Sequence, residues 1–165
     1  FILSKGYACL ALFFALVKKK FLKKKDLETF ELDGSNLLGH PIMNKLLGIE
    51  FSTGSLGMGL SLGIGTALAA KRKKMNYKVF VVLGDGECNE GAIWESILSA
   101  CHFKLDNMII IVDRNKFQQT GKNSSIMDLK NLKNKFKKVN RFHNLKLNGD
   151  KRFSLTTRTS SNRRP

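Results

Sequence analysis

The stretch that decides the fold is residues 78–86, Lys-Val-Phe-Val-Val-Leu-Gly-Asp-Gly, in which a short apolar run ends at a glycine-flanked aspartate. A second apolar run, rich in β-branched residues, occupies residues 108–112. Both runs are short and apolar without interruption, and this pattern predicts strands buried on both faces of a parallel sheet. The segment between them, residues 87–103, has apolar residues at helical spacing. Strand, helix and strand in this order predict a βαβ unit of an α/β fold.

The polar residues that follow these two strands predict a site. Asp85 comes directly after the first strand, between Gly84 and Gly86, and Asn115 follows the second. Neighbouring parallel strands end at the same crevice, where a helix N-terminus offers free N–H groups to phosphate. The glycines permit a tight turn and close approach of a ligand. Carboxylate and amide oxygens suit Mg²⁺ or Ca²⁺, so the pattern predicts a metal-diphosphate site, although Gly-Asp-Gly alone is also typical of ordinary turns.

Several motifs in register extend this pattern. Residues 84–95 read Gly-Asp-Gly-Glu-Cys-Asn-Glu-Gly-Ala-Ile-Trp-Glu, and residues 112–115 read Val-Asp-Arg-Asn. Upstream stand Leu-Ser-Lys-Gly at 3–6, Gly-His-Pro at 39–41 and Ser-Thr-Gly-Ser-Leu-Gly-Met-Gly at 52–59. In order and spacing these motifs resemble the thiamine diphosphate motif of transketolases, particularly the split two-chain form. The resemblance covers roughly residues 1–130.

The resemblance implies a thiamine diphosphate-binding fold, an α/β domain with a parallel sheet and helices on both faces. We expect residues 1–150 to form this diphosphate-binding domain, incomplete at its N-terminus. Residues 151–165 lack an apolar period and are rich in Arg, Ser, Thr and Asn, which predicts a basic disordered tail.

The resemblance also assigns roles to residues of the motifs. It implies that Mg²⁺, or Ca²⁺ in its place, would be held by the side chains of Asp85 and Asn115 and by the backbone carbonyl of Phe117. Gly84 and Gly86 would bind the diphosphate, in agreement with the expected helix N-terminus. The resemblance also implies that Gly54 and Leu56 lie against the aminopyrimidine ring of the cofactor.

Two residues take catalytic roles in the resemblance. His40 matches a histidine that contacts the ketose donor beside the cofactor, and Glu90 matches an acid at the dimer interface near the acid that activates the cofactor. The bland alternatives are a loop histidine for His40 and, for Glu90, an acid favoured by the helix dipole. One departure concerns Tyr7, which follows Ser-Lys-Gly where the family usually has histidine. A phenol titrates near pH 10, so it can donate a hydrogen bond but is a poor proton shuttle at neutral pH.

The implied function is transfer of a two-carbon ketol unit from a ketose phosphate to an aldose with thiamine diphosphate, whose carbanion-like ylid attacks the ketose. At 165 residues the chain has the size of one domain, and such enzymes need a second domain. We therefore expect a homodimer, or a partner chain or domain on the C-terminal side, to complete the site. The substrates would be sugar phosphates.

The charge is strongly positive, with a formal net charge of +16, and is concentrated near the C-terminus. Residues 122–165 hold 13 Lys and Arg against 2 Asp. A nucleic-acid-binding protein or a catalytically inactive remnant is therefore the alternative. Aromatic residues are sparse there, so we expect no nucleic-acid binding. We expect no membrane segment either, since both long apolar stretches fit buried helices, and three cysteines without metal spacing fit the cytoplasm.

Overall fold

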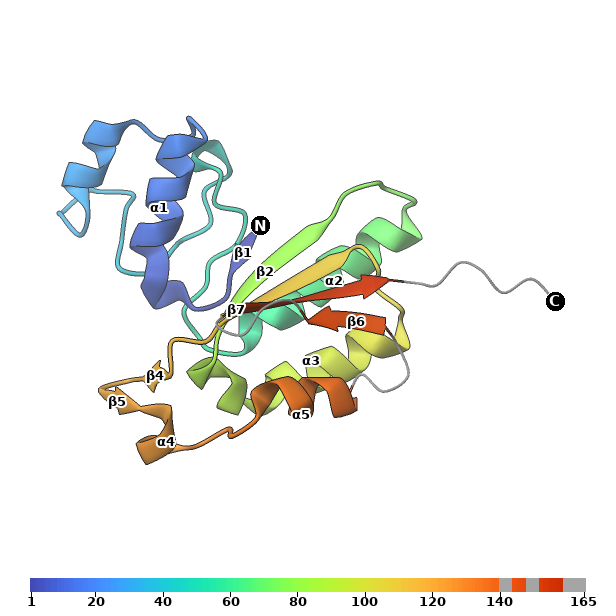
Figure 1. The fold of residues 1–165 in the computed structure, drawn as a ribbon. Coiled ribbons are helices and arrows are strands. Elements are labelled where there is room, and N and C mark those ends of the chain that lie inside the picture. The colour runs from blue at the N-terminus through green and yellow to red at the C-terminus, as the bar shows by residue number, and fades with distance from the viewer. Residues whose placement is uncertain (140–143, 148–151, 159–165) are drawn as a thin grey trace.

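The computed structural model describes residues 1–139, 144–147 and 152–158, which form a central sheet flanked by helices (Figure 1). Across the sheet the strands run β1 (Ile2–Leu3), β2 (Val79–Gly84), β3 (Met108–Asp113), β7 (Arg152–Arg158) and β6 (Asn144–Leu147). The first three strands are parallel to one another, whereas β7 is antiparallel to both β3 and β6. The parallel part of the sheet thus has the predicted βαβ arrangement.

The other elements lie before, between and after these strands. The helices are α1 (Cys9–Lys18), α2 (Met58–Arg72), α3 (Gly91–His102), α4 (Asn123–Ile126) and α5 (Leu132–Val139). Short 3₁₀ helices span Gly6–Ala8, Lys24–Thr29, Lys45–Leu47 and Gly86–Asn89. A small hairpin, β4 (Phe117–Gln118) with β5 (Gly121–Lys122), follows β3.

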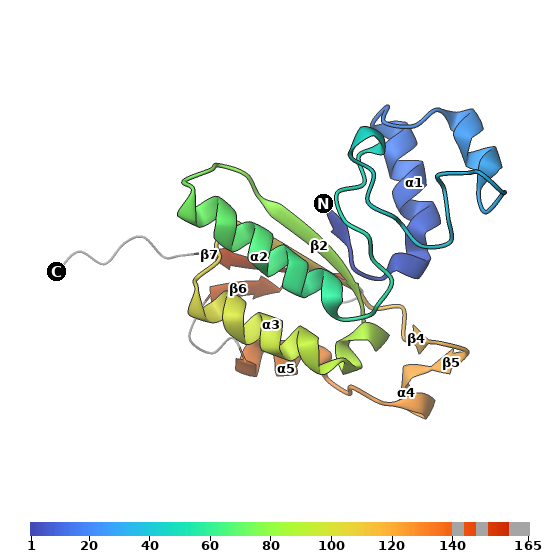
Figure 2. The same ribbon diagram turned by 180° about the vertical axis from the view of Figure 1, so that it is seen from behind.

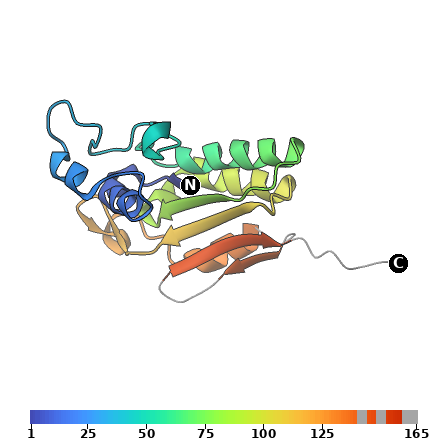
Figure 3. The same cartoon turned by 90° about the horizontal axis from the view of Figure 1, so that it is seen from above.

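Helices α2 and α3 run side by side against one face of the sheet, with α5 next to α3 (Figures 2 and 3). Each connects two neighbouring parallel strands, and because such crossovers share one hand, both helices arrive on the same face. Their apolar stripes pack on the strands in a core that includes Leu60, Ile64, Val81, Leu83, Ile93, Ile97, Ile110 and Val112.

The opposite face of β2 and β3 differs from the prediction. Val79 and Val81 are buried, but Phe80 between them is 38% exposed, and β3 alternates in the same way. The α/β class is confirmed, yet the expectation that both faces of these strands are buried is wrong. Within the described part of the chain, α2, α3 and α5 pack in one core with the face of the strands that carries Val79, Val81 and Leu83.

Helix α1 belongs to a second, smaller core beyond the sheet. Phe13 is fully buried there and meets Phe30 edge to face, with ring centroids 6.2 Å apart. The long segment between α1 and α2 wraps around this core and contributes Leu37 and Ile49. This segment also carries the predicted His40 back toward the end of the sheet.

Glycines set how closely α2 approaches the sheet. A Cβ at Gly59 would lie 2.7 Å from the Cα of Ser4, and one at Gly63 would lie 2.6 Å from a methyl carbon of Val81. A Cβ at Gly65 would meet no atom within 4 Å. The first two glycines therefore permit contact between the helix and the strands of the same chain.

The C-terminal part differs from the sequence-based expectation. Strand β7 lies within the segment predicted to be a disordered tail, and it pairs along β3 from Ile109 to Asp113. Antiparallel pairing satisfies backbone donors and acceptors whatever the side-chain charge, and composition does not report it. The predicted boundary at residue 150 therefore falls inside the sheet; residue 151 and residues 159–165 of the predicted tail lie outside the described residues.

Two further expectations can be compared with the described helices. The helix predicted over 87–103 is a 3₁₀ helix followed by α3, which begins at Gly91 because Glu90 has extended backbone angles. Among the described residues, no helix combines the length and apolar character that crossing a bilayer requires.

Candidate cofactor site

The predicted site residues lie at the carboxyl ends of β1, β2 and β3. Gly84 pairs with Asp113 at the last position of the β2–β3 ladder, and the N–H of Asp85 donates to the carbonyl of Asp113 over 3.2 Å. The two strands therefore end level with each other. As a result the turns that follow them, which carry Asp85 and Asn115, leave the sheet at the same edge.

Asp85 and Asn115 point their oxygens at one short backbone segment. The carboxylate of Asp85, only 3% exposed, accepts from the N–H of Gly86 (3.0 Å) and from the N–H of Lys116 (2.9 Å). The side-chain oxygen of Asn115 accepts from the N–H of Phe117 (2.8 Å). The three predicted metal ligands are thus neighbours around a single turn.

The chemistry of this donor set fits the predicted metal. It comprises one carboxylate, one amide oxygen and one carbonyl oxygen, the hard ligands that Mg²⁺ and Ca²⁺ prefer. Within residues 1–139, no three His, Cys, Asp or Glu side chains gather in the manner of a zinc site. The remaining coordination positions would be available to diphosphate oxygens.

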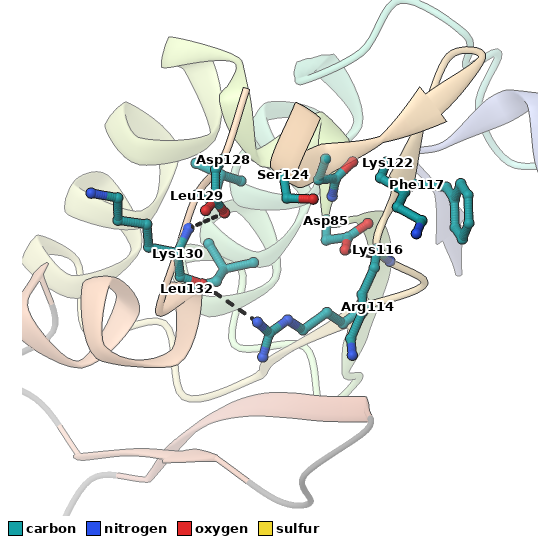
Figure 4. A pocket seen from close by; sticks show the side chains of 11 residues that line it. Asp85, Arg114, Lys116, Phe117, Lys122, Ser124, Asp128, Leu129, Lys130 and Leu132 are labelled. Carbon is teal, nitrogen blue, oxygen red and sulfur yellow. Dashed lines mark hydrogen bonds between the residues drawn. The ribbon is translucent and has the colours of Figure 1, made fainter. Parts of the chain in front are cut away.

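A cavity of about 290 Å³ opens beside Asp85 and is rich in cations (Figure 4). Its lining includes Arg114, Lys116, Lys122 and Lys130, together with Phe117. The guanidinium of Arg114 donates to the carbonyl of Lys130 (3.4 Å), which keeps it along the wall. Positive side chains around one buried carboxylate favour an anionic ligand that arrives with a metal ion.

The residues predicted to meet the cofactor ring lie on the other side of this edge. A Cβ at Gly54 would come within 2.7 Å of the imidazole of His40, so these two residues are in contact. The same segment abuts the start of the chain, because a Cβ at Gly6 would lie 2.6 Å from the carbonyl oxygen of Thr53. His40 is exposed and therefore accessible to a ligand.

Glu90 joins this group through the start of α2. A Cβ at Gly57 would lie 3.0 Å from the Cβ of Glu90, and Leu56, partly exposed, immediately precedes Gly57. Glu90 is itself exposed at the beginning of α3. The structure thus brings the Gly54–Gly57 loop, Glu90 and His40 to the same end of the sheet as Asp85.

Tyr7 lies at the junction of the two groups. Its side chain is 52% exposed, and its hydroxyl lies 3.0 Å from the position of a Cβ at Gly84. Partial burial raises the pKa of the phenol above 10, and the nearby carboxylates add to this, while the Lys5 ammonium opposes it. Tyr7 therefore stays neutral at physiological pH and serves as a hydrogen-bonding group.

Three polar interactions at this edge were not predicted from sequence. Lys5, almost fully buried, pairs with Asp113 over 2.5 Å. Glu87 accepts hydrogen bonds from three separate segments of the chain. The thiol of Cys88 donates to the carbonyl of Gly84 over 3.3 Å, and burial, followed by the charges of Glu87 and Asp85, raises its pKa. The sequence signals for Glu87 are its place directly after Gly-Asp-Gly and its part in the motif at 84–95, and neither predicts its hydrogen-bond partners.

Comparisons with known proteins agree with this geometry. The family model described as "Transketolase, thiamine diphosphate binding domain" matches residues 1–158. The chain is 40% identical over 150 residues to an apulose-4-phosphate transketolase subunit of Phocaeicola vulgatus, covering 91% of this chain and 53% of that protein. It is 37% identical over 136 residues to a 6-deoxy-6-sulfo-D-fructose transketolase subunit of a Clostridium species, covering 82% of this chain and 50% of that subunit.

Solved structures show the same fold. The transketolase of Campylobacter jejuni superposes with a TM-score of 0.76 at 31% identity, covering 84% of this chain and 23% of the other. The chain spans about half the length of the curated relatives it matches. From the family match and the shared fold, we conclude that the chain belongs to the transketolase family, in which it matches the thiamine diphosphate-binding domain.

Proposed function

We propose that the chain is the diphosphate-binding half of a transketolase and works with a partner chain or domain. The observation that carries this proposal is the convergence of Asp85, Asn115 and Phe117 at the level ends of β2 and β3. Two relatives, each about twice as long as the part that this chain matches, are named as subunits of transketolases, which supports a partner for this chain. The substrates would be a ketose phosphate as donor and an aldose as acceptor.

Mg²⁺ is the proposed metal. Asp85 and Asn115 would supply side-chain oxygens and Phe117 its carbonyl, while the Gly84–Gly86 turn, in which the N–H of Gly86 donates to the Asp85 carboxylate, would face the diphosphate. Cations of the adjacent cavity, such as Lys116, would balance the charge of the phosphates. When bound, thiamine diphosphate supplies a stabilised carbanion at its thiazolium ring, the chemistry that ketol transfer needs.

The exposed group on the other side would receive the ring and the sugar. Gly54 and Leu56 offer backbone and apolar contact to a flat heterocycle. His40, exposed and held against Gly54, would contact the donor sugar, and Glu90 would lie near the acid that the partner contributes. Tyr7 would donate a hydrogen bond in place of a group able to exchange protons at neutral pH.

Basic nucleic-acid binding, the alternative suggested by the charge, is not favoured by the comparisons, since the relatives named above are transketolases. We further propose a cytosolic location. There Cys9, Cys88 and Cys101, which form no disulfide among residues 1–139, would persist as thiols.

Calorimetric titration with thiamine diphosphate, with and without Mg²⁺, tests the proposal. We expect binding that depends on Mg²⁺ and falls by about 100-fold or more in Asp85→Ala and Asn115→Ala, because even residues behind metal ligands contribute 10- to 100-fold. Asp128→Asn is the matched control, since Asp128 lines the same cavity but bonds the N–H of Lys130. Binding unchanged in the Asp85 and Asn115 variants would refute the assignment.

A further inference from the structure

Glu87 is a buried carboxylate that links the end of β2 to two segments distant in the chain. It follows the end of β2 closely, and the residue is only 1% exposed. One oxygen, Oε1, accepts from the N–H of Gly57 (2.9 Å) and from the hydroxyl of Ser4 (2.5 Å). The other, Oε2, accepts from the N–H of Gly84 (3.0 Å). Each carboxylate oxygen therefore has at least one donor.

These donors belong to different parts of the candidate site. Ser4 follows β1, Gly57 precedes α2 at the end of the Gly54–Gly57 loop, and Gly84 ends β2 immediately before Asp85. All three segments lie at one end of the sheet, where the start of α2 meets the end of β2 (Figure 2). One carboxylate thus bridges the turn that carries Asp85 and the loop that would face the cofactor ring.

Resting on the proposed function, we propose that Glu87 is a positioning residue that fixes the distance between these two parts of the cofactor site. A ligand spanning both parts needs the Gly54–Gly57 loop and the Gly84–Gly86 turn at one separation. A ligand that meets the turn alone does not. Glu87 is inaccessible to the ligand and acts through the backbone it binds.

The packing around Glu87 shows why its loss need not unfold the chain. Gly59 lies against Ser4, and Gly57 lies against Glu90, so the three segments also touch through van der Waals contacts. Those contacts keep the elements together. The hydrogen bonds to Glu87 select one alignment among closely packed ones, because they require the donors of Gly57 and Gly84 to point at the same carboxyl group.

The chemistry of the three donors explains a carboxylate here. Every partner donates a hydrogen, so the acceptor needs two oxygens and no N–H of its own. In Glu87→Gln one oxygen becomes an NH₂ group that faces a donor, and at least one buried N–H loses its partner. A buried N–H without a partner is costly, so the local alignment should open more often.

Amide hydrogen exchange on the full chain tests, without any ligand, whether Glu87 holds Gly57 and Gly84 in place; we call this arrangement the clamp. In Glu87→Gln we expect exchange at Gly57 or Gly84 to accelerate about tenfold or more, while amides in the centre of β3 keep their rates. Glu95→Gln is the matched control, since Glu95 is an exposed acid on α3. Unchanged exchange at both glycines would overturn the proposal, and acceleration throughout the sheet would show a general structural role instead.

Binding tests the consequence for the site. With Mg²⁺ present, we expect Glu87→Gln to weaken thiamine diphosphate binding about tenfold and inorganic pyrophosphate binding by less than about twofold. Equal losses for the two ligands would overturn the positioning role. If the unaltered chain binds no thiamine diphosphate, the proposed function fails, and the exchange rates at Gly57 and Gly84 still decide whether Glu87 is the clamp.

Discussion

The two halves of the candidate site are built in different ways. The diphosphate half, comprising Gly84–Gly86 and Asn115–Phe117, follows directly from the ends of two paired strands, and its carboxylate is buried and hydrogen-bonded. The donor half, comprising His40 and Gly54–Leu56, lies on exposed or partly exposed loop segments, and Tyr7 lies where the two halves meet. The proposed ligand contacts of the first half follow directly on paired strands, although Asn115 and Phe117 are exposed, whereas those of the second half lie on loops.

This difference matches the two kinds of chemistry. A metal ion requires oxygens in fixed positions, which strand ends provide. A sugar that enters and leaves needs accessible groups, which loops provide more readily. Tyr7, which departs from the family pattern, lies beside Gly84 at the junction of the two halves. The comparison predicts that changes in the two halves will have separable effects.

The largest expected effect concerns the place where the donor half joins the sheet. In Gly6→Ala the new Cβ would lie 2.6 Å from the carbonyl oxygen of Thr53 and 2.8 Å from the nitrogen of Gly54, both backbone atoms. We expect a loss of about 1–3 kcal/mol in the free energy of unfolding. Gly65→Ala, in open space on α2, should instead stabilise by about 0.5–1 kcal/mol. Urea denaturation measures both, and similar values would contradict the tight junction.

Tyr7→His should give cofactor binding a dependence on pH. An imidazole at this position would gain a positive charge below about pH 6.5, near the predicted diphosphate. Thiamine diphosphate affinity should then rise about tenfold between pH 8 and pH 5.5, relative to the unaltered chain. Tyr7→Phe is the control, and titration calorimetry at several pH values measures the effect. If the ratio of the two affinities, that of the Tyr7→His variant and that of the unaltered chain, does not change with pH, Tyr7 lies away from the diphosphate.

The phenol of Tyr7 should lose its proton at a higher pH than a free tyrosine does. Its pKa is raised above 10, mainly by partial burial, so folding favours the neutral form. The neutral phenol contributes its stability fully below pH 10, and this contribution is lost as the pH rises through the pKa of the folded state. The difference in absorbance at about 295 nm between the unaltered chain and Tyr7→Phe measures the pKa. A value at or below 10 would contradict the position of the ring.

The smallest expected effect is that of His40→Ala on cofactor affinity. The imidazole is exposed and contacts Gly54 rather than the metal-binding turn. Thiamine diphosphate binding should therefore change by less than about twofold, as is usual for exposed side chains outside a binding contact. A tenfold loss of affinity would instead show that His40 and the Asp85 turn act together in binding, and would contradict the separation of the two halves.

The diphosphate half could be predicted from sequence because it is local to two strands. Apolar runs fix β2 and β3, and parallel pairing then brings Asp85 and Asn115 to one edge. Glu87 could not be recognised in this way. Two of its partners, Ser4 and Gly57, are 83 and 30 residues away in the chain, and no local pattern reports which distant donors a carboxylate will meet.

The sequence also could not predict which face of β2 and β3 is the more deeply buried. Phe80 and Ile109 are apolar on the more exposed face, just as Val81 and Ile110 are on the buried face, so an apolar run cannot show that the two faces are buried to different extents. Strand β7 was not predicted from sequence for a related reason. Its basic, polar composition suggested disorder, whereas its place in the sheet rests on backbone pairing with β3.

The buried thiol beneath the Gly84–Asp85 turn gives the molecule an internal reporter. Cys88 is fully buried, its hydrogen bond to Gly84 ties it to that turn, and its pKa is raised, so the reactive thiolate is scarce while the turn is closed. Alkylation of this sulfur therefore requires the turn to open. Its labelling rate therefore measures how often the edge that carries Asp85 opens, and a ligand that binds across this edge should lower the rate.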